Sequence, residues 1–313
     1  MKITLKSVLT GALCSLVLCQ SMAIAQETQS EEAIKRAQTL ENLPDYAAKR
    51  HFGSARKPAS LEARAIGSYA KGCLAGASAL PVDGESWQVM RLSRNRNWGH
   101  PDLVNLLERL ARKVPDISNW GGILVGDMSQ PRGGPMLTGH ASHQVGLDAD
   151  VWLTPMPDRK LSNSERENMS ATNMVNAQWM DVDSKVFTKD QVSIVKAAAS
   201  EPAVARIFVN PAIKVALCRN GGADRNWLSK VRPMWGHNYH FHIRMACPQG
   251  SENCEDQAIP KDGDGCGKEL SDWLAQQHKA MFSPKRPNVP GKPKPPMTLD
   301  ALPQECRDVL VAR

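Results

Sequence analysis

The placement of histidine constrains this chain more than any other feature of its sequence. Five of the eight histidines lie in two short motifs, GHASHQVGLDAD at residues 139–150 and HNYHFH at 237–242. Apolar and polar residues alternate across 147–153 and 239–245, which is the period of a half-buried strand. Alternation places His240, His242 and Arg244 on one face of the second strand. The other face then carries the side chains of Tyr239, Phe241, Ile243 and Met245.

The first motif supplies carboxylates in the same alternating way. Asp148 and Asp150 share one strand face, and the glycine-containing turn before them can bring His143 back beside Asp150. Two imidazoles and one carboxylate from neighbouring strands make a three-ligand tetrahedral site with one open position, which is typical of catalytic zinc. The alternative interpretation is that the histidines satisfy buried hydrogen bonds and that the two aspartates cap a turn. The number of histidines and their pairing with carboxylates favour the metal site.

The N-terminal residues are typical of a secretory signal peptide. Lys2 and Lys6 precede an apolar stretch at 8–17, and Ala23 and Ala25 provide small residues at positions −3 and −1 before Gln26. We therefore expect cleavage after Ala25, which removes residues 1–25. No later apolar run approaches the ~18 residues of a transmembrane helix, so no membrane span is expected.

Six cysteines remain once this leader is removed. An even number in an exported chain predicts three disulfides, and the residues alone leave 15 pairings open. A zinc knuckle is the alternative, but the sequence contains no Cys-x-x-Cys. The six residues are Cys73, Cys218, Cys247, Cys254, Cys266 and Cys306.

Composition divides the chain into four segments. The signal peptide is followed by a polar arm at 26–61 with a candidate helix at 31–43, a body at 62–282 and a proline-rich segment at 283–313. Seven prolines between 283 and 303 exclude a helix or a central strand there, and we expect Cys306 to tie this segment back to the body. Within the body, helices are predicted at 101–114 and 188–199, and further strands at 122–125 and 206–209. The predicted class is α+β, with a small, mainly antiparallel sheet carrying the metal site between helices and long disulfide-tied loops.

Charge and aromatic content limit the partner. Lys and Arg number 39 against 32 Asp and Glu, and without the two lysines of the leader the balance is 37 − 32 = +5. A small cationic surplus suits an anionic partner surface. Aromatic residues make up 5% of the chain, and no basic run is interleaved with them. A nucleic-acid-binding protein that stacks bases is therefore not expected.

These motifs carry a family resemblance. His143-x6-Asp150 followed by His240-x-His242 resembles the signature shared by lysostaphin-type endopeptidases, D-Ala-D-Ala dipeptidases and the hedgehog signalling domain. Longer segments between residues 65 and 306 resemble the bacterial penicillin-insensitive murein endopeptidase family, with the cysteines in corresponding places. These segments are GHASHQVGLDADVW, RIFVNPAIKVALC, DRNWLSKVRPMWGHNYHFHIRMACP and GDGCG.

The resemblance implies a metal-ligand set. One active-site zinc ion would be held by His143, Asp150 and His242, with His140 also at the metal. Asp148 is expected either to hold a ligand imidazole in its tautomer or to be a simple strand-end carboxylate.

The implied activity is that of a periplasmic zinc metallo-endopeptidase. Such a hydrolase cuts the D-alanyl–meso-diaminopimelate cross-links of peptidoglycan with a water that zinc activates. No His-Glu-x-x-His is present, so His240 is expected to be the general base or electrostatic partner, supported by His237. A mechanism without an acyl-enzyme serine would be insensitive to penicillin. The alternatives are a zinc D,D-carboxypeptidase or dipeptidase acting on D-Ala termini, which a closed pocket with a buried arginine would favour, and a murein-binding module without activity.

The resemblance also implies a disulfide pattern and raises the question of a second metal. The implied pairs are Cys73–Cys306, Cys218–Cys266 and Cys247–Cys254. Family members hold a second zinc between chains through an Asp-x-x-His, but the corresponding stretch at 176–189 has Asp181 and Asp183 without a histidine. A second zinc is therefore not expected, and a homodimer stays an open alternative.

Overall fold

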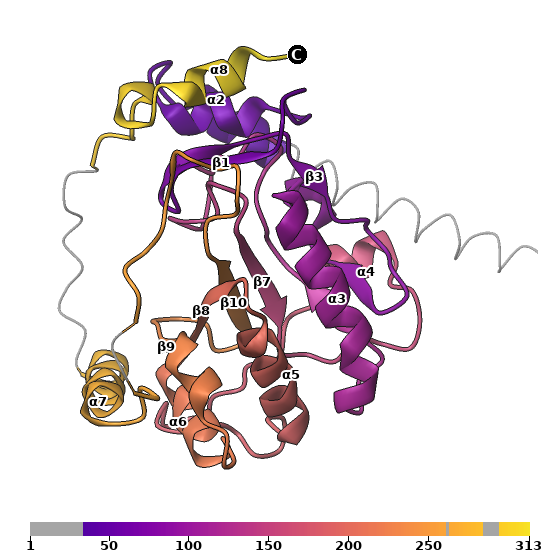
Figure 1. Cartoon of the computed structure of the whole chain (residues 1–313), viewed down its shortest axis with the longest axis vertical. Coiled ribbons are helices and arrows are strands. Elements are labelled where there is room, and N and C mark those ends of the chain that lie inside the picture. Colours follow the sequence, from indigo (N-terminus) through magenta and orange to yellow (C-terminus); the bar gives the residue numbers. More distant parts are fainter. Residues whose placement is uncertain (1–33, 261–262, 284–293) are drawn as a thin grey trace, which may run out of the picture.

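A six-stranded mixed sheet forms the centre of the computed structural model, which describes residues 34–260, 263–283 and 294–313 (Figure 1). Its strand order is β4-β6-β7-β10-β8-β9. The four inner strands pair antiparallel, whereas β4 and β9 join the two edges in parallel. The predicted α+β class with a small, mainly antiparallel sheet is thus confirmed. The strands are β4 (Trp87–Val89), β6 (Ile123–Val125), β7 (Asp148–Trp152), β8 (Val204–Val209), β9 (Val231–Pro233) and β10 (His240–Met245).

Helices cover one face of this sheet, because alternate strand residues on that face are apolar. α3 (Pro101–Ile117) and α5 (Lys189–Ser200) lie in front of the sheet in Figure 1 and contact each other. Their apolar side chains form one core with Ala149 and Val151 of β7 and with Phe241 and Ile243 of β10. The opposite face of β7 and β10 carries Asp148, Asp150, Trp152, His240, His242 and Arg244.

Smaller elements surround this core. Residues 34–41 are helical, within the range predicted for the arm, while the predicted signal peptide at 1–25 lies outside the described residues. Across the described segments, no helix is both long and apolar enough to cross a membrane.

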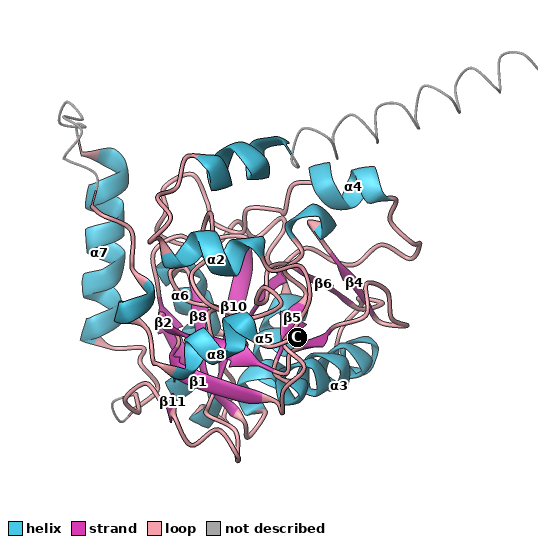
Figure 2. Cartoon of the chain, turned by 90° about the horizontal axis from the view of Figure 1, so that it is seen from above, coloured by secondary structure: helices cyan, strands magenta, loops and turns pink. Residues whose placement is uncertain are grey.

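Among the remaining elements, α7 stands at one edge of the molecule in Figure 2. The helices are α2 (Ala48–Ser54), α4 (Asn163–Asn168), α6 (Pro211–Arg219), α7 (Lys268–Phe282) and α8 (Glu305–Val311), with 3-10 turns η1 (Leu92–Arg94), η2 (Asn226–Lys230) and η3 (Leu299–Ala301). The smaller sheets are β11-β1-β2 (Cys254–Glu255, Arg64–Ser68, Lys71–Ala75) and β3-β5 (Ser78–Ala79, Trp98–Gly99).

The two ends of the described chain meet in a second core. α2 and α8 lie together beside β1 in Figure 1, and Phe52 of α2 and Leu302 belong to one buried apolar cluster with Cys306 and Val309 of α8. The disulfide Cys73–Cys306 joins α8 to β2 across 233 residues of sequence. The residues that follow the proline-rich stretch are therefore packed against the body.

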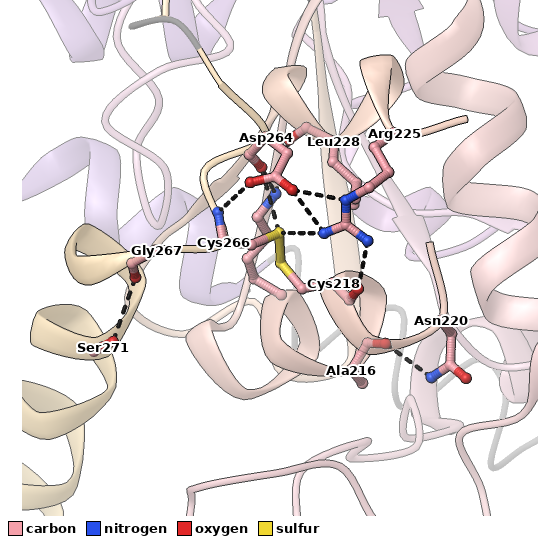
Figure 3. The surroundings of a disulfide bond; sticks show 10 residues. Ala216, Cys218, Asn220, Arg225, Leu228, Asp264, Cys266, Gly267 and Ser271 are labelled. Atoms are coloured by element: carbon pink, nitrogen blue, oxygen red, sulfur yellow. Dashed lines mark hydrogen bonds and ion pairs between the residues drawn. A yellow bond between two sulfur atoms is a disulfide. The ribbon is translucent and has the colours of Figure 1, made fainter. Parts of the chain in front are cut away.

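The other two disulfides fasten loops around the central sheet. Cys218–Cys266 links the end of α6 to the loop before α7, and Cys247–Cys254 closes a short loop after β10. Figure 3 shows that Arg225 lies across the first of these bonds, donating to the Asp264 carboxylate and to the carbonyl of Cys218. The three pairs are those that the family resemblance implies.

Lys214 of α6 is fully buried near this disulfide. Its Nζ donates to the carbonyl oxygens of Leu228 and Asp264, each at 2.7 Å. Burial is the main reason that the pKa of Lys214 falls to about 7. Below pH 7 the ammonium is charged in both the folded and the unfolded chain, so its burial destabilises the fold. Between pH 7 and ~10.4 the folded protein has released this proton while the unfolded chain still binds it, and stability rises with pH.

Replacing Lys214 with methionine should remove this pH dependence. We expect the free energy of unfolding of the wild type, relative to Lys214→Met, to rise by about 2 kcal/mol from pH 7 to pH 9, because each such pH unit contributes about 1.4 kcal/mol. Urea denaturation of both proteins at each pH measures the difference. Lys268→Met, a change at an exposed lysine of α7, is the control. A difference between wild type and Lys214→Met that stays constant with pH would contradict the prediction.

Candidate functional site

The register of β7 against β10 builds the polar site. His242 lies directly opposite Asp150, and Arg244 lies opposite Asp148. Side chains opposite each other on antiparallel strands have Cβ atoms about 4.5–5.5 Å apart. The register therefore places a histidine from the second motif against a carboxylate from the first.

The loop before β7 brings the remaining histidines of the first motif to the same place. Gly146 has φ of +71°, and a Cβ there would lie 2.4 Å from the Leu74 side chain, so the turn requires glycine. His143 also has a left-handed backbone, with φ of 65°. Its N–H donates to Oδ2 of Asp148 at 3.0 Å. This bond holds the loop back over the strand, as the sequence predicts for His143.

Four imidazoles surround the carboxylate of Asp150. The Nε2 atoms of His143 and His240 each lie 3.5 Å from its Oδ1, and Nδ1 of His242 lies 3.3 Å from the same atom. Nε2 of His140 lies 3.5 Å from Oδ2. The structure thus brings together the candidate ligands of the two motifs, and Asp150 is the residue they share.

His143 and His242 are oriented as metal ligands usually are. Nδ1 of His143 bonds the carbonyl oxygen of Met128 at 2.9 Å, and Nε2 of His242 bonds Oδ1 of Asp148 at 2.7 Å. The other nitrogen of each ring faces Oδ1 of Asp150. Fixing one imidazole nitrogen by a hydrogen bond while the other points at the metal is the usual arrangement around a bound ion.

Two buried atoms at this point have no hydrogen-bond partner among the described residues, Nε2 of His143 and Oδ1 of Asp150. Buried polar atoms are rarely unpaired in proteins unless a water or an ion completes them. His140, His143 and Asp150 also offer three ligand atoms within 4.8 Å of one another. Imidazole and carboxylate groups in this arrangement can bind a metal ion.

His140 is held by a residue that the sequence analysis did not identify. Asp127, which follows β6 after one glycine, accepts a hydrogen bond from Nε2 of His140 at 3.0 Å. The same atom, Oδ2 of Asp127, also forms ion pairs with Nη1 of Arg94 at 3.0 Å and Nη1 of Arg96 at 2.8 Å. His140 therefore directs one nitrogen at both Asp127 and Asp150. The signal in the sequence was only a lone carboxylate after a short apolar run, and no spacing linked it to the histidines.

Asp148 carries the charge network beneath the site. It is fully buried, and its Oδ1 accepts bonds from His242 and from Nε of Arg244 at 2.8 Å. Burial alone would raise the pKa of Asp148, but His242 and Arg244 hold it below its usual value. Burial would likewise lower the pKa of His242, yet Asp148 and Asp150 raise it to about 9.

His240 and His237 lie on the other side of Asp150. His240 is buried, its Nδ1 has no partner among the described residues, and burial lowers its pKa below the usual value. The ring of His237 lies 4.8 Å from that of His240. Burial and the neighbouring imidazoles of His240 and His242 lower the pKa of His237 to about 4. Both rings are therefore neutral near pH 7, so each has a lone pair that can accept a proton.

A cavity of about 280 Å³ opens beside these side chains. Its walls include His140, Asp150 and His240 from the site, and Arg91, Arg94, Trp152 and Tyr239 around it. Arg94 also lines a second cavity, of about 370 Å³.

Comparison with known proteins gives a consistent result. The family model described as penicillin-insensitive murein endopeptidase matches residues 65–311. A protein of that name from Haemophilus influenzae is 46% identical over 236 residues, which cover 74% of this chain and 78% of the relative. Namesakes from Escherichia coli O1:K1 / APEC and from Shigella boydii are 41% and 42% identical, covering 81% and 77% of this chain and 88% and 86% of theirs.

The matched region contains β7, β10 and every residue of the candidate site. With the match spanning most of the chain, the protein belongs to the penicillin-insensitive murein endopeptidase family of peptidases.

Proposed function

We propose that this protein is a periplasmic zinc endopeptidase that hydrolyses the D-alanyl–meso-diaminopimelate cross-links of peptidoglycan. The observation that carries the proposal is the convergence of His140, His143, His240 and His242 on the buried carboxylate of Asp150. The relatives are named for cleavage of murein, the same polymer, and the predicted signal peptide suits a periplasmic enzyme.

The residues that would hold zinc are His143, Asp150 and His242, with His140 beside them. Two neutral imidazoles and a carboxylate are a common ligand set for catalytic zinc. When bound, zinc supplies a Lewis acid for the scissile carbonyl and lowers the pKa of a water molecule. Asp148 keeps the free nitrogen of His242 turned toward Asp150, because it accepts the hydrogen on the other nitrogen.

His240 is the group that we assign to proton transfer. It lies on the same strand face as His242 and approaches Asp150 through Nε2. Its neutral ring can take a proton from the attacking water and deliver it to the leaving amine, a role that typically accelerates a reaction by about 10²–10⁴-fold. His237, next to His240, supports this ring. No serine forms an acyl-enzyme in such a reaction, so a β-lactam has no nucleophile to trap.

The shape of the site favours an endopeptidase over a carboxypeptidase. A carboxypeptidase would need a closed pocket with a buried arginine for the terminal carboxylate. Arg96 is buried beside the site, but its guanidinium is occupied by Asp127 and by the Thr138 carbonyl. The arginines that line the site cavity, Arg91 and Arg94, are only half-buried, and Arg94 also lines the second cavity.

Cleavage of purified cross-linked muropeptide dimers tests the proposed activity. We expect the mature protein to convert dimers to monomers, with activity abolished by a chelator and restored by zinc, and mass spectrometry identifies the bond. Loss of terminal alanine alone would indicate a carboxypeptidase. Metal binding without any cleavage would indicate a murein-binding module.

Substitutions at the site separate ligands from the proton carrier. His240→Ala should keep zinc and lose about 10²–10⁴-fold in kcat, whereas His143→Ala and Asp150→Ala should lose the metal. Metal content by mass spectrometry and kcat on dimers are the measurements. His278→Ala, a change at an exposed histidine of α7, is the matched control. Loss of zinc from His240→Ala would show that His240 is a ligand, and full occupancy in His143→Ala would move the metal elsewhere.

A further inference from the structure

Arg94 stands at the rim of the site cavity with part of its guanidinium unused. Its side chain is 41% exposed, and its Nη1 donates to Oδ2 of Asp127 at 3.0 Å. Nε and Nη2 bond no other residue in the part of the chain that the structure describes. Arg94 and Asp150 line the same cavity, so a ligand bound there lies beside this side chain.

The other arginines of this wall are occupied. Arg96 is buried and donates to Asp127 and Thr138. Arg91 donates to backbone carbonyls of the α4 region, including that of Met169 at 2.8 Å, and its guanidinium lies 5.3 Å from the ring centre of Trp152. Of the two arginines that line the Asp150 cavity, Arg94 is the one whose Nε and Nη2 bond no other residue among those the structure describes.

The backbone that carries Arg94 is held in an unusual conformation. Arg94 ends the 3-10 turn η1, and the residues on either side of the turn, Arg91 and Asn95, have φ of 57° and 52°. A non-glycine residue in the left-handed region costs about 1–3 kcal/mol, and such residues gather at ligand sites. Both carboxylate oxygens of Glu167 bond Ser93, which fixes the turn in place. The turn is therefore pre-organised and presents Arg94 at the rim.

The substrate of the proposed function has a carboxylate that would need this cation. In a diaminopimelate cross-link, the carbon that bears the scissile amide nitrogen also bears a free carboxylate. In the cavity that carboxylate would lie near Asp127 and Asp150, which repel it. A guanidinium can offset the repulsion and form a charge-assisted hydrogen bond or a bidentate pair.

Resting on the proposed function, we infer that Arg94 binds the carboxylate next to the scissile amide nitrogen. Arg94 thereby selects cross-links made through diaminopimelate over those made through lysine, which has a hydrogen in place of this carboxylate. Asp127 orients the Arg94 guanidinium by accepting a hydrogen bond from Nη1. The remaining N–H groups of Arg94 donate to the substrate carboxylate.

A pair of matched dimers tests the inference, one cross-linked through diaminopimelate and one through lysine. We expect the wild type to have a kcat/KM about 10–100-fold higher on the first, as the strength of a charged hydrogen bond implies. Arg94→Gln should lose that factor on the diaminopimelate dimer and change less than about three-fold on the lysine dimer. Arg94→Lys should recover part of the preference, because the charge remains without the planar fork. Arg112→Gln, a change at an exposed arginine of α3, is the control.

Binding of the uncross-linked monomers provides a readout that does not depend on turnover. By calorimetry, the diaminopimelate monomer should bind the wild type more tightly than the lysine monomer, and Arg94→Gln should remove the difference while zinc content stays unchanged.

The outcomes separate this inference from the proposed function. If the wild type cuts neither dimer, the proposed function is wrong, and the monomer affinities still decide the role of Arg94. If it cuts both equally well, the function stands and the inference is wrong. If Arg94→Gln slows both dimers to the same extent, Arg94 acts through Asp127 and His140 and does not read the carboxylate.

Discussion

The buried carboxylate of Asp148 is the interaction on which the site depends. Taking an ionised group out of water costs several kcal/mol unless hydrogen bonds and opposite charge compensate it. Here the compensation comes from the ring of His242, the guanidinium of Arg244 and the backbone N–H of His143. One carboxylate therefore orients a residue of β10 and anchors the loop before β7. Removing any of these partners would leave the buried Asp148 carboxylate with fewer hydrogen bonds. The two histidine motifs therefore depend on the same carboxylate.

The same network joins the site to the second core. The guanidinium of Arg244 lies 4.1 Å from the ring centre of Tyr69, and the Tyr69 hydroxyl donates to the carbonyl of Met245 at 2.6 Å. Tyr69 sits between β1 and β2, and β2 carries Cys73, which the disulfide ties to Cys306 in α8. Helix α8 is thus connected to β10 through a short series of packed residues and the long disulfide.

Backbone strain in this protein gathers around the cavity. Among the described non-glycine residues, those with positive φ are Arg91, Asn95, His143, His237 and Trp179, and the first four flank or form the site. Side chains in this region of φ and ψ conflict with local preference, and such conflicts are expected where function overrides stability. A sequence pattern cannot reveal them, because none of these residues is a glycine that would mark the position. This is why η1 and its Arg94 were absent from the sequence-based site.

The sequence by itself determined which residues share a face. Alternation in 147–153 and 239–245 put Asp148 with Asp150 and His240 with His242, and the apolar spacing of 101–114 predicted α3, because period alone fixes these relations. The tertiary structure decided the rest. Three features of the site each join segments that are far apart in the chain. They are the pairing of His242 with Asp150, the hydrogen bond between Asp127 and His140, and the position of Arg94 in the wall of the Asp150 cavity. The alternating pattern fixes which face of each strand is buried, but no hairpin turn joins β7 to β10 and sets their register. Loop positions likewise depend on packing between distant segments. From the residues alone, the disulfide pairing was open for the same reason.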